Sequence, residues 1–133
     1  MRDYDPKSAA WHDRRARGVR IVGEALEAFA WGEPQSVAPP DVRDQLAQQL
    51  AWIAKEFPTQ GSPEESFSAL VSAIDAALLF SVQRWTVNRP GEGPDPPLGW
   101  VRSHVAFSLG DWLGDNSRVR LPRRPPQTAR RDW

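Results

Sequence analysis

Two side chains of this sequence could perform acid–base chemistry, His104 and Asp75. Each lies in a segment with helical periodicity, and a catalytic role would require a nucleophile or a second carboxylate within hydrogen-bond reach. The sequence identifies no such partner. The simpler interpretation is a hydrogen-bonded helix histidine and a solvated carboxylate, or one that pairs with an arginine such as Arg15. We therefore expect no catalytic residue, and we rank a small hydrolase or ligand-binding bundle that uses His104 and Asp75 third among the functions considered.

The sequence also lacks metal and cofactor motifs. His12 is followed by Asp13, but adjacent residues of a helix do not face each other. No histidine pair or histidine–glutamate pair has the spacing of a metal-binding helix, and there is no cysteine. The glycines at 91, 93 and 99 are interleaved with prolines and lack the strand and the lysine of a phosphate-binding loop. We expect no metal and no cofactor.

Positive charge is concentrated at the C-terminal end. Residues 117–133 contain six arginines and one aspartate, a net charge of +5, and because the whole chain is neutral the remainder carries −5. The prolines of this tail favour an extended or disordered chain. Such a tail suits nucleic-acid phosphates, an acidic groove on a protein or on a second copy, or simply a solvated terminus. The tail residues predicted to bind a partner are Arg118, Arg120, Arg123, Arg124, Arg130 and Arg131.

Seven tryptophans are many for 133 residues. Trp11, Trp85 and Trp112 coincide with apolar stripes, so we predict that they belong to the core. The other four lie at segment ends or off the stripes, where tryptophan either anchors an interface or packs over a loop. The tryptophans predicted to bind a partner are Trp52, Trp100 and Trp133.

The segment from Ser62 to Arg89 is the best-defined element. Ser62 is a suitable N-cap, Pro63 suits the first turn, and Glu65 can complete a capping box. Pro90 disfavours helical geometry at the residue before it. One face repeats apolar residues at heptad spacing and a second lies roughly opposite, so we expect a central helix covered on two sides. The two faces comprise Phe67, Val71, Ile74, Leu78, Ser81 and Trp85, and Ala69, Ala73, Ala76 and Phe80.

Three further helices are predicted at residues 6–30, 41–57 and 98–113. Asp5 is the expected N-cap of the first, in which Gly18 and Gly23 each cost about 1 kcal/mol relative to alanine, and Gly114 is expected to stop the last. The predicted fold is all-α, a single antiparallel bundle of four helices at residues 1–116 followed by the tail. The residues predicted to be buried together are Val22, Leu46, Leu50, Ile53, Phe67, Leu70, Ile74 and Leu78.

The composition indicates the number of domains, the cellular compartment and the type of genome. A chain of 133 residues is expected to form one domain with its own core. The absence of cysteine, the polar N-terminal residues and the shortness of the longest apolar run, residues 76–80, favour a cytoplasmic protein without a signal peptide or a membrane span. Fifteen arginines against two lysines indicate a GC-rich bacterial or phage genome.

These observations predict a small non-enzymatic bacterial or phage interaction protein, with an adaptor, immunity or inhibitor, or assembly-subunit role. It would present a tryptophan-rich helical face and the basic tail to another protein or to a second copy of itself. No membrane interaction is expected. The alternative is a nucleic-acid-associated regulator that uses the tail with Arg14, Arg17 and Arg20, although these arginines are predicted to point in different directions.

Overall fold

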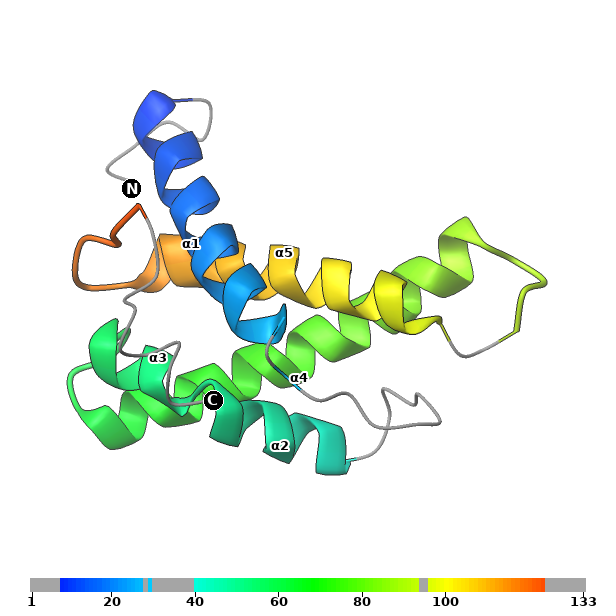
Figure 1. The fold of residues 1–133 in the computed structure, drawn as a ribbon, viewed down its shortest axis with the longest axis horizontal. Coiled ribbons are helices and arrows are strands. Elements are labelled where there is room, and N and C mark those ends of the chain that lie inside the picture. The colour runs from blue at the N-terminus through cyan, green and yellow to red at the C-terminus, as the bar shows by residue number, and fades with distance from the viewer. Residues whose placement is uncertain (1–7, 28, 30–39, 94–95, 124–133) are drawn as a thin grey trace.

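A computed structural model describes residues 8–27, 29, 40–93 and 96–123 (Figure 1). All regular secondary structure within these residues is helical, which confirms the predicted all-α class. The predicted antiparallel bundle of four helices is not confirmed, because the described part contains five helices and the first crosses the last obliquely (Figure 1). The helices are α1 (Ala9–Glu27), α2 (Pro40–Gln49), α3 (Ala51–Glu56), α4 (Pro63–Asn88) and α5 (Leu98–Asn116).

The ends of α4 follow the local signals of the sequence. Ser62 is the N-cap in extended geometry, and its hydroxyl accepts a hydrogen bond from the Glu65 backbone N–H at 3.1 Å. At the other end, the Arg89 N–H donates to the Trp85 carbonyl, and helical geometry stops before Pro90. The predicted boundaries are therefore confirmed.

The helix predicted at residues 41–57 is interrupted at Leu50. Leu50 has φ −98° and ψ 6°, and it separates α2 from α3. Its side chain nevertheless stays in the core together with Leu46, Ile53 and Phe57. The apolar spacing continues through the break, so a pattern based on that spacing alone predicts one uninterrupted helix.

The first helix begins at Ala9. The hydroxyl of Ser8 accepts a hydrogen bond from the Trp11 backbone N–H at 3.2 Å. Ser8 therefore has the N-cap role that the sequence analysis expected of Asp5. Asp5 and the predicted ends of this helix at residues 6 and 30 lie outside the described residues.

Backbone contact between two helices holds α1 on α5. A Cβ atom added to Gly18 would meet the Gly110 carbonyl oxygen, and one added to Gly114 would lie 2.6 Å from the Arg14 carbonyl oxygen. Only glycine permits such an approach, because it has no Cβ. Gly114 therefore lies within α5 instead of stopping it, and the glycine predicted only to weaken the first helix, Gly18, is a packing residue.

The core lies between α4, α5 and the helices on either side of them. Of the residues predicted to be buried together, all are buried except Phe67, which is 36% exposed. The prediction that α4 is covered on two sides is wrong, since Phe80 of the second predicted face is 44% exposed and Ala76 of the same face is also exposed. The physical reason is the arrangement of the helices: α1 packs mainly on α5, which leaves one side of α4 uncovered.

Among the described helices, α4 alone is long and apolar enough to cross a membrane, judged by length and composition. The expectation that no segment spans a membrane was based on uninterrupted apolar runs, whereas this criterion applies to the length and mean hydropathy of the whole helix. Core helices of soluble proteins share it, and α4 contributes Leu70, Ile74, Ala77 and Leu78 to the core cluster.

Candidate functional site: a groove and two hollows with basic walls

A groove runs between the exposed sides of α4 and α5. Its volume is about 420 Å³. Two aromatic rings form its apolar walls, Phe80 at 44% and Phe107 at 50% exposed. Single exposed apolar side chains are common on protein surfaces, whereas several that line one depression indicate a binding surface. We call this depression the Phe80–Phe107 groove, and it is lined by Phe80, Arg84, Ser103, His104, Phe107 and Ser108.

Trp100 lies next to the groove, where it contacts the lining residue His104. Its indole N–H donates to the Ser81 carbonyl at 2.9 Å, and its ring stacks on His104 with centroids 4.2 Å apart. Nδ1 of His104 lies 3.0 Å from the Trp100 carbonyl, which fixes the imidazole over the indole. A buried tryptophan, Trp85, meets Trp100 edge to face. Trp100 is thus half-buried and engaged within the chain, and it orients His104.

Phe107 is shared with a second hollow, between α5 and α1. The volume of this hollow is about 560 Å³. The Arg15 guanidinium lies 4.3 Å from the Phe107 ring centroid and 5.0 Å from that of Trp11, in cation–π geometry. We call this region the Arg15 hollow, and its lining residues are His12, Arg15, Ala16, Val19, Arg20 and Phe107.

The position of Arg15 is set by an ion pair with Asp111, at 3.2 Å from Nε to Oδ1. Burial raises the pKa of the Asp111 carboxyl above its ordinary value, the adjacent Arg15 charge opposes that rise, and Asp115 adds to it. The described residues that line the groove and the Arg15 hollow include no carboxylate, so the polar part of this surface is basic.

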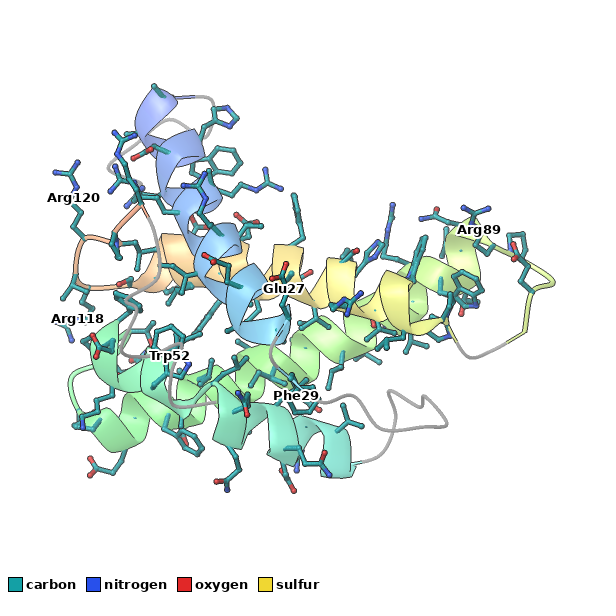
Figure 2. All side chains as sticks on the ribbon, viewed as in Figure 1. Glu27, Phe29, Trp52, Arg89, Arg118 and Arg120 are labelled. Carbon is teal, nitrogen blue, oxygen red and sulfur yellow. The ribbon has the colours of Figure 1, made fainter. Side chains whose placement is uncertain are left out.

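A third hollow, of about 260 Å³, lies where α1 meets the chain that follows α5. Two arginines of α1 are hydrogen-bonded to the chain that follows α5. Arg17 donates from Nη1 to the Leu121 carbonyl at 2.7 Å, and Arg20 donates from Nη1 to the Arg123 carbonyl at 2.7 Å. Figure 2 shows Arg118 and Arg120 at this end of the molecule, and Arg89 at the opposite end.

Residues 117–123 are therefore packed chain. Leu121 is 4% exposed and belongs to the core cluster. The Arg118 N–H donates to the Pro58 carbonyl at 2.8 Å, which ties this segment to the loop after α3. The sequence analysis assigned these residues to an extended or disordered tail, whereas residues 118 and 121 contact the rest of the fold. The side chains of Arg118, Arg120 and Arg123 are exposed.

The predicted partner-binding tryptophans do not meet on one described face. Trp52 is half-buried on α3 (Figure 2), where it packs against the core and lies edge to face with Phe57 at 6.2 Å between ring centroids. Trp100 belongs to α5 and contacts Ser81 of α4. The remaining predicted site residues lie outside the described residues, and these are Arg124, Arg130, Arg131 and Trp133.

The two residues considered for acid–base chemistry are not brought together. Asp75 is exposed and lies 4.0 Å from Arg43 of α2, whereas His104 lines the Phe80–Phe107 groove. Asp111, not Asp75, pairs with Arg15. No group of three or more His, Cys, Asp or Glu side chains within the described part of the chain could hold a metal ion.

The sequence reasoning did not identify Phe80, Phe107 and Arg84 as site residues. Phe80 belongs to the second face that was predicted to be buried, and Phe107 lies in the helix predicted at residues 98–113, whose apolar residues cover more than one face. That excess was the usable signal: an amphipathic helix with apolar residues outside its core stripe either has a second neighbour or presents them to solvent. Comparison with known proteins finds no matching protein family, no matching curated protein and no matching solved structure.

Proposed function

We propose that this chain is a small, non-enzymatic, cytoplasmic interaction protein of bacterial or phage origin that binds an acidic amphipathic helix of a partner protein. The partner helix would lie in the Phe80–Phe107 groove and extend toward the Arg15 hollow. The observation that carries the proposal is the pairing of two half-exposed phenylalanines with arginines in two hollows that share Phe107. Adaptor, inhibitor or immunity, and assembly roles all use such a surface.

The apolar walls support a helix as the occupant. An amphipathic helix inserts apolar residues from successive turns into a groove, and Phe80 and Phe107 offer two aromatic surfaces for them. Aromatic anchors at the centre of an interface account for much of its binding energy.

The charges support an acidic partner. Arg84 lies at the α4 side of the groove, and Arg15 and Arg20 lie beyond Phe107. Complementary charge at the rim accelerates association and selects the partner, although exposed ion pairs add little affinity. A lysine-rich helix would meet the same arginines with like charge.

The experiment uses two synthetic amphipathic helices with identical leucine and alanine positions, one carrying glutamate and the other lysine on the polar face. Isothermal titration should detect binding of the glutamate peptide only. Phe107→Ala should weaken it about tenfold or more, because it removes a central aromatic contact. Leu79→Ala is the matched control, since Leu79 is exposed on α4 but does not line the groove. Equal affinity for both peptides, or equal effects of both substitutions, would refute the proposal.

A nucleic-acid-associated regulator is the second candidate, and the packing of the α1 arginines against residues 121–123 favours it. A nucleic acid would lie along the exposed arginines 118, 120 and 123. The logarithm of its binding constant should fall with the logarithm of salt concentration, with a slope of about −0.9 per phosphate contacted on duplex DNA. Affinity without this salt dependence would argue against it.

A further inference from the structure

We infer that the third hollow is a binding site for a single phosphate group. We call it the arginine pocket. It is independent of the Phe80–Phe107 groove, and it requires no nucleic acid, because its volume of about 260 Å³ suits a small anion. Its lining residues are Asp13, Arg14, Arg17, Gly114, Ser117, Arg118, Val119, Arg120 and Leu121.

Arg17 is the fixed element of this pocket. It is 7% exposed, its Nε lies 2.9 Å from Asp13 Oδ2, and its Nη1 donates to the Leu121 carbonyl. The contact with Leu121 uses one of the five N–H donors of the guanidinium, and the ion pair with Asp13 restrains the group further. An arginine held in this way presents its other donors in a set direction, so little conformational entropy is lost when an anion binds.

The side chains that line the pocket are predominantly basic. Four arginines line it, whereas Asp13 is the one carboxylate among the described lining residues, so the net charge is +3. Asp13 is itself paired with Arg17. A bound anion with two negative charges would offset much of this positive charge.

The chain that carries Arg118 and Arg120 is held by its backbone. The Arg118 N–H donates to Pro58, the Ser117 hydroxyl donates to the Val119 carbonyl at 2.9 Å, and Leu121 anchors the segment in the core. The side chains of Arg118 and Arg120 remain exposed at the mouth of the pocket. A fixed backbone with exposed guanidinium groups suits a ligand that arginine contacts with two parallel hydrogen bonds.

This geometry favours phosphate as the ligand class. Arginine forms bidentate, charge-assisted hydrogen bonds with phosphate, and several arginines can surround its oxygens. The phosphate group could belong to a free phosphate monoester or to a nucleic-acid backbone. These two sources share the same chemistry at the pocket and differ in what lies outside it.

The test is titration of the full chain with inorganic phosphate, with phenyl phosphate and with a short single-stranded oligonucleotide. Binding is measured from the NMR signals of the arginine side chains during each titration. Arg118→Gln and Arg120→Gln should each weaken binding about tenfold or more, because each removes charge-assisted hydrogen bonds. Asp13→Asn should tighten it, because it removes the one carboxylate of the described lining. Arg89→Gln is the matched control for charge, because Arg89 lies at the opposite end of the molecule (Figure 2).

Each result decides between outcomes. Binding of phosphate and phenyl phosphate without binding of the oligonucleotide supports the pocket and identifies a phosphate monoester as the source. Binding of the oligonucleotide in competition with inorganic phosphate supports it and identifies a nucleic-acid backbone. Binding that Arg89→Gln weakens as much as Arg118→Gln reflects overall charge and overturns the inference. The absence of binding by all three probes also overturns it.

Discussion

Alanine at two glycines of α1 should move the stability of this protein in opposite directions. Helix propensity alone predicts that Gly18→Ala and Gly23→Ala each stabilise it by about 1 kcal/mol. The surroundings differ, however. A Cβ at Gly23 would have no atom within 4 Å, whereas a Cβ at Gly18 would meet the Gly110 carbonyl oxygen and lie 2.9 Å from the Gly114 nitrogen.

The difference in stability between Gly18→Ala and Gly23→Ala measures the free-energy cost of a Cβ atom at the contact between α1 and α5. The gain in propensity is common to both variants, so it cancels in the difference between them. What remains is the strain at Gly18, where the obstructing atoms belong to a backbone and cannot move aside by rotating a side chain. Inserting a methyl group into a packed contact costs about 1–3 kcal/mol, and a backbone obstruction belongs at the upper end of that range. Gly23→Ala should therefore be more stable than Gly18→Ala by about 2–3 kcal/mol.

Urea unfolding followed by far-ultraviolet circular dichroism measures this difference directly. The slope of the free energy against urea should stay the same in both variants, because neither changes the surface exposed on unfolding by much. Gly110→Ala provides an independent check, since its Cβ would lie 2.6 Å from the Val19 nitrogen. If Gly18→Ala proved as stable as Gly23→Ala, the close contact between α1 and α5 would be refuted.

Three further predictions concern the core and the ion pair. Leu121→Ala should lower the free energy of unfolding by about 2–5 kcal/mol, and a chain ending at residue 116 should unfold at lower urea than one ending at residue 123. Ile74→Ala should cost a similar amount in the same assay, and a loss below about half a kcal/mol would contradict its burial. Because the pKa of Asp111 is raised in the folded state, this carboxyl contributes stability that is complete below its unfolded pKa and is lost as pH rises through the folded pKa. Asp111→Asn should abolish that gain, so its stability relative to the unmodified chain should fall as the pH of thermal unfolding is lowered.

Local signals account for the parts of the fold that the sequence predicted well. The ends of α4 depend on Ser62 and on Pro90, which act on backbone groups within one turn of themselves. The buried positions of α2, α3 and α4 follow from apolar periodicity, which reports the side of a helix that faces a core. Such features require no knowledge of which helices become neighbours.

The features that the sequence did not predict are relations between distant residues. Gly18 lowers helix propensity by the same amount in any helix. Its role in packing is seen only when Gly110 and Gly114 lie opposite it. Leu121 stands among prolines and arginines, and nothing nearby indicates that it enters a core formed by other segments. Phe80 and Phe107 line a groove because α1 packs on α5 and leaves the side of α4 that carries Phe80 uncovered.

The two proposed binding surfaces depend on the same helix contact. Arg15 reaches Phe107 and Asp111 from one side of α1, and Arg17 reaches Leu121 from another. Between them lies the backbone contact of Gly18, with no side-chain layer that could absorb a shift by repacking. A separation of α1 from α5 would therefore move Arg15 away from Phe107 and Arg17 away from the chain that frames the arginine pocket. The three glycines thus do more than permit close packing: they set the positions of the basic side chains on which both proposals rest.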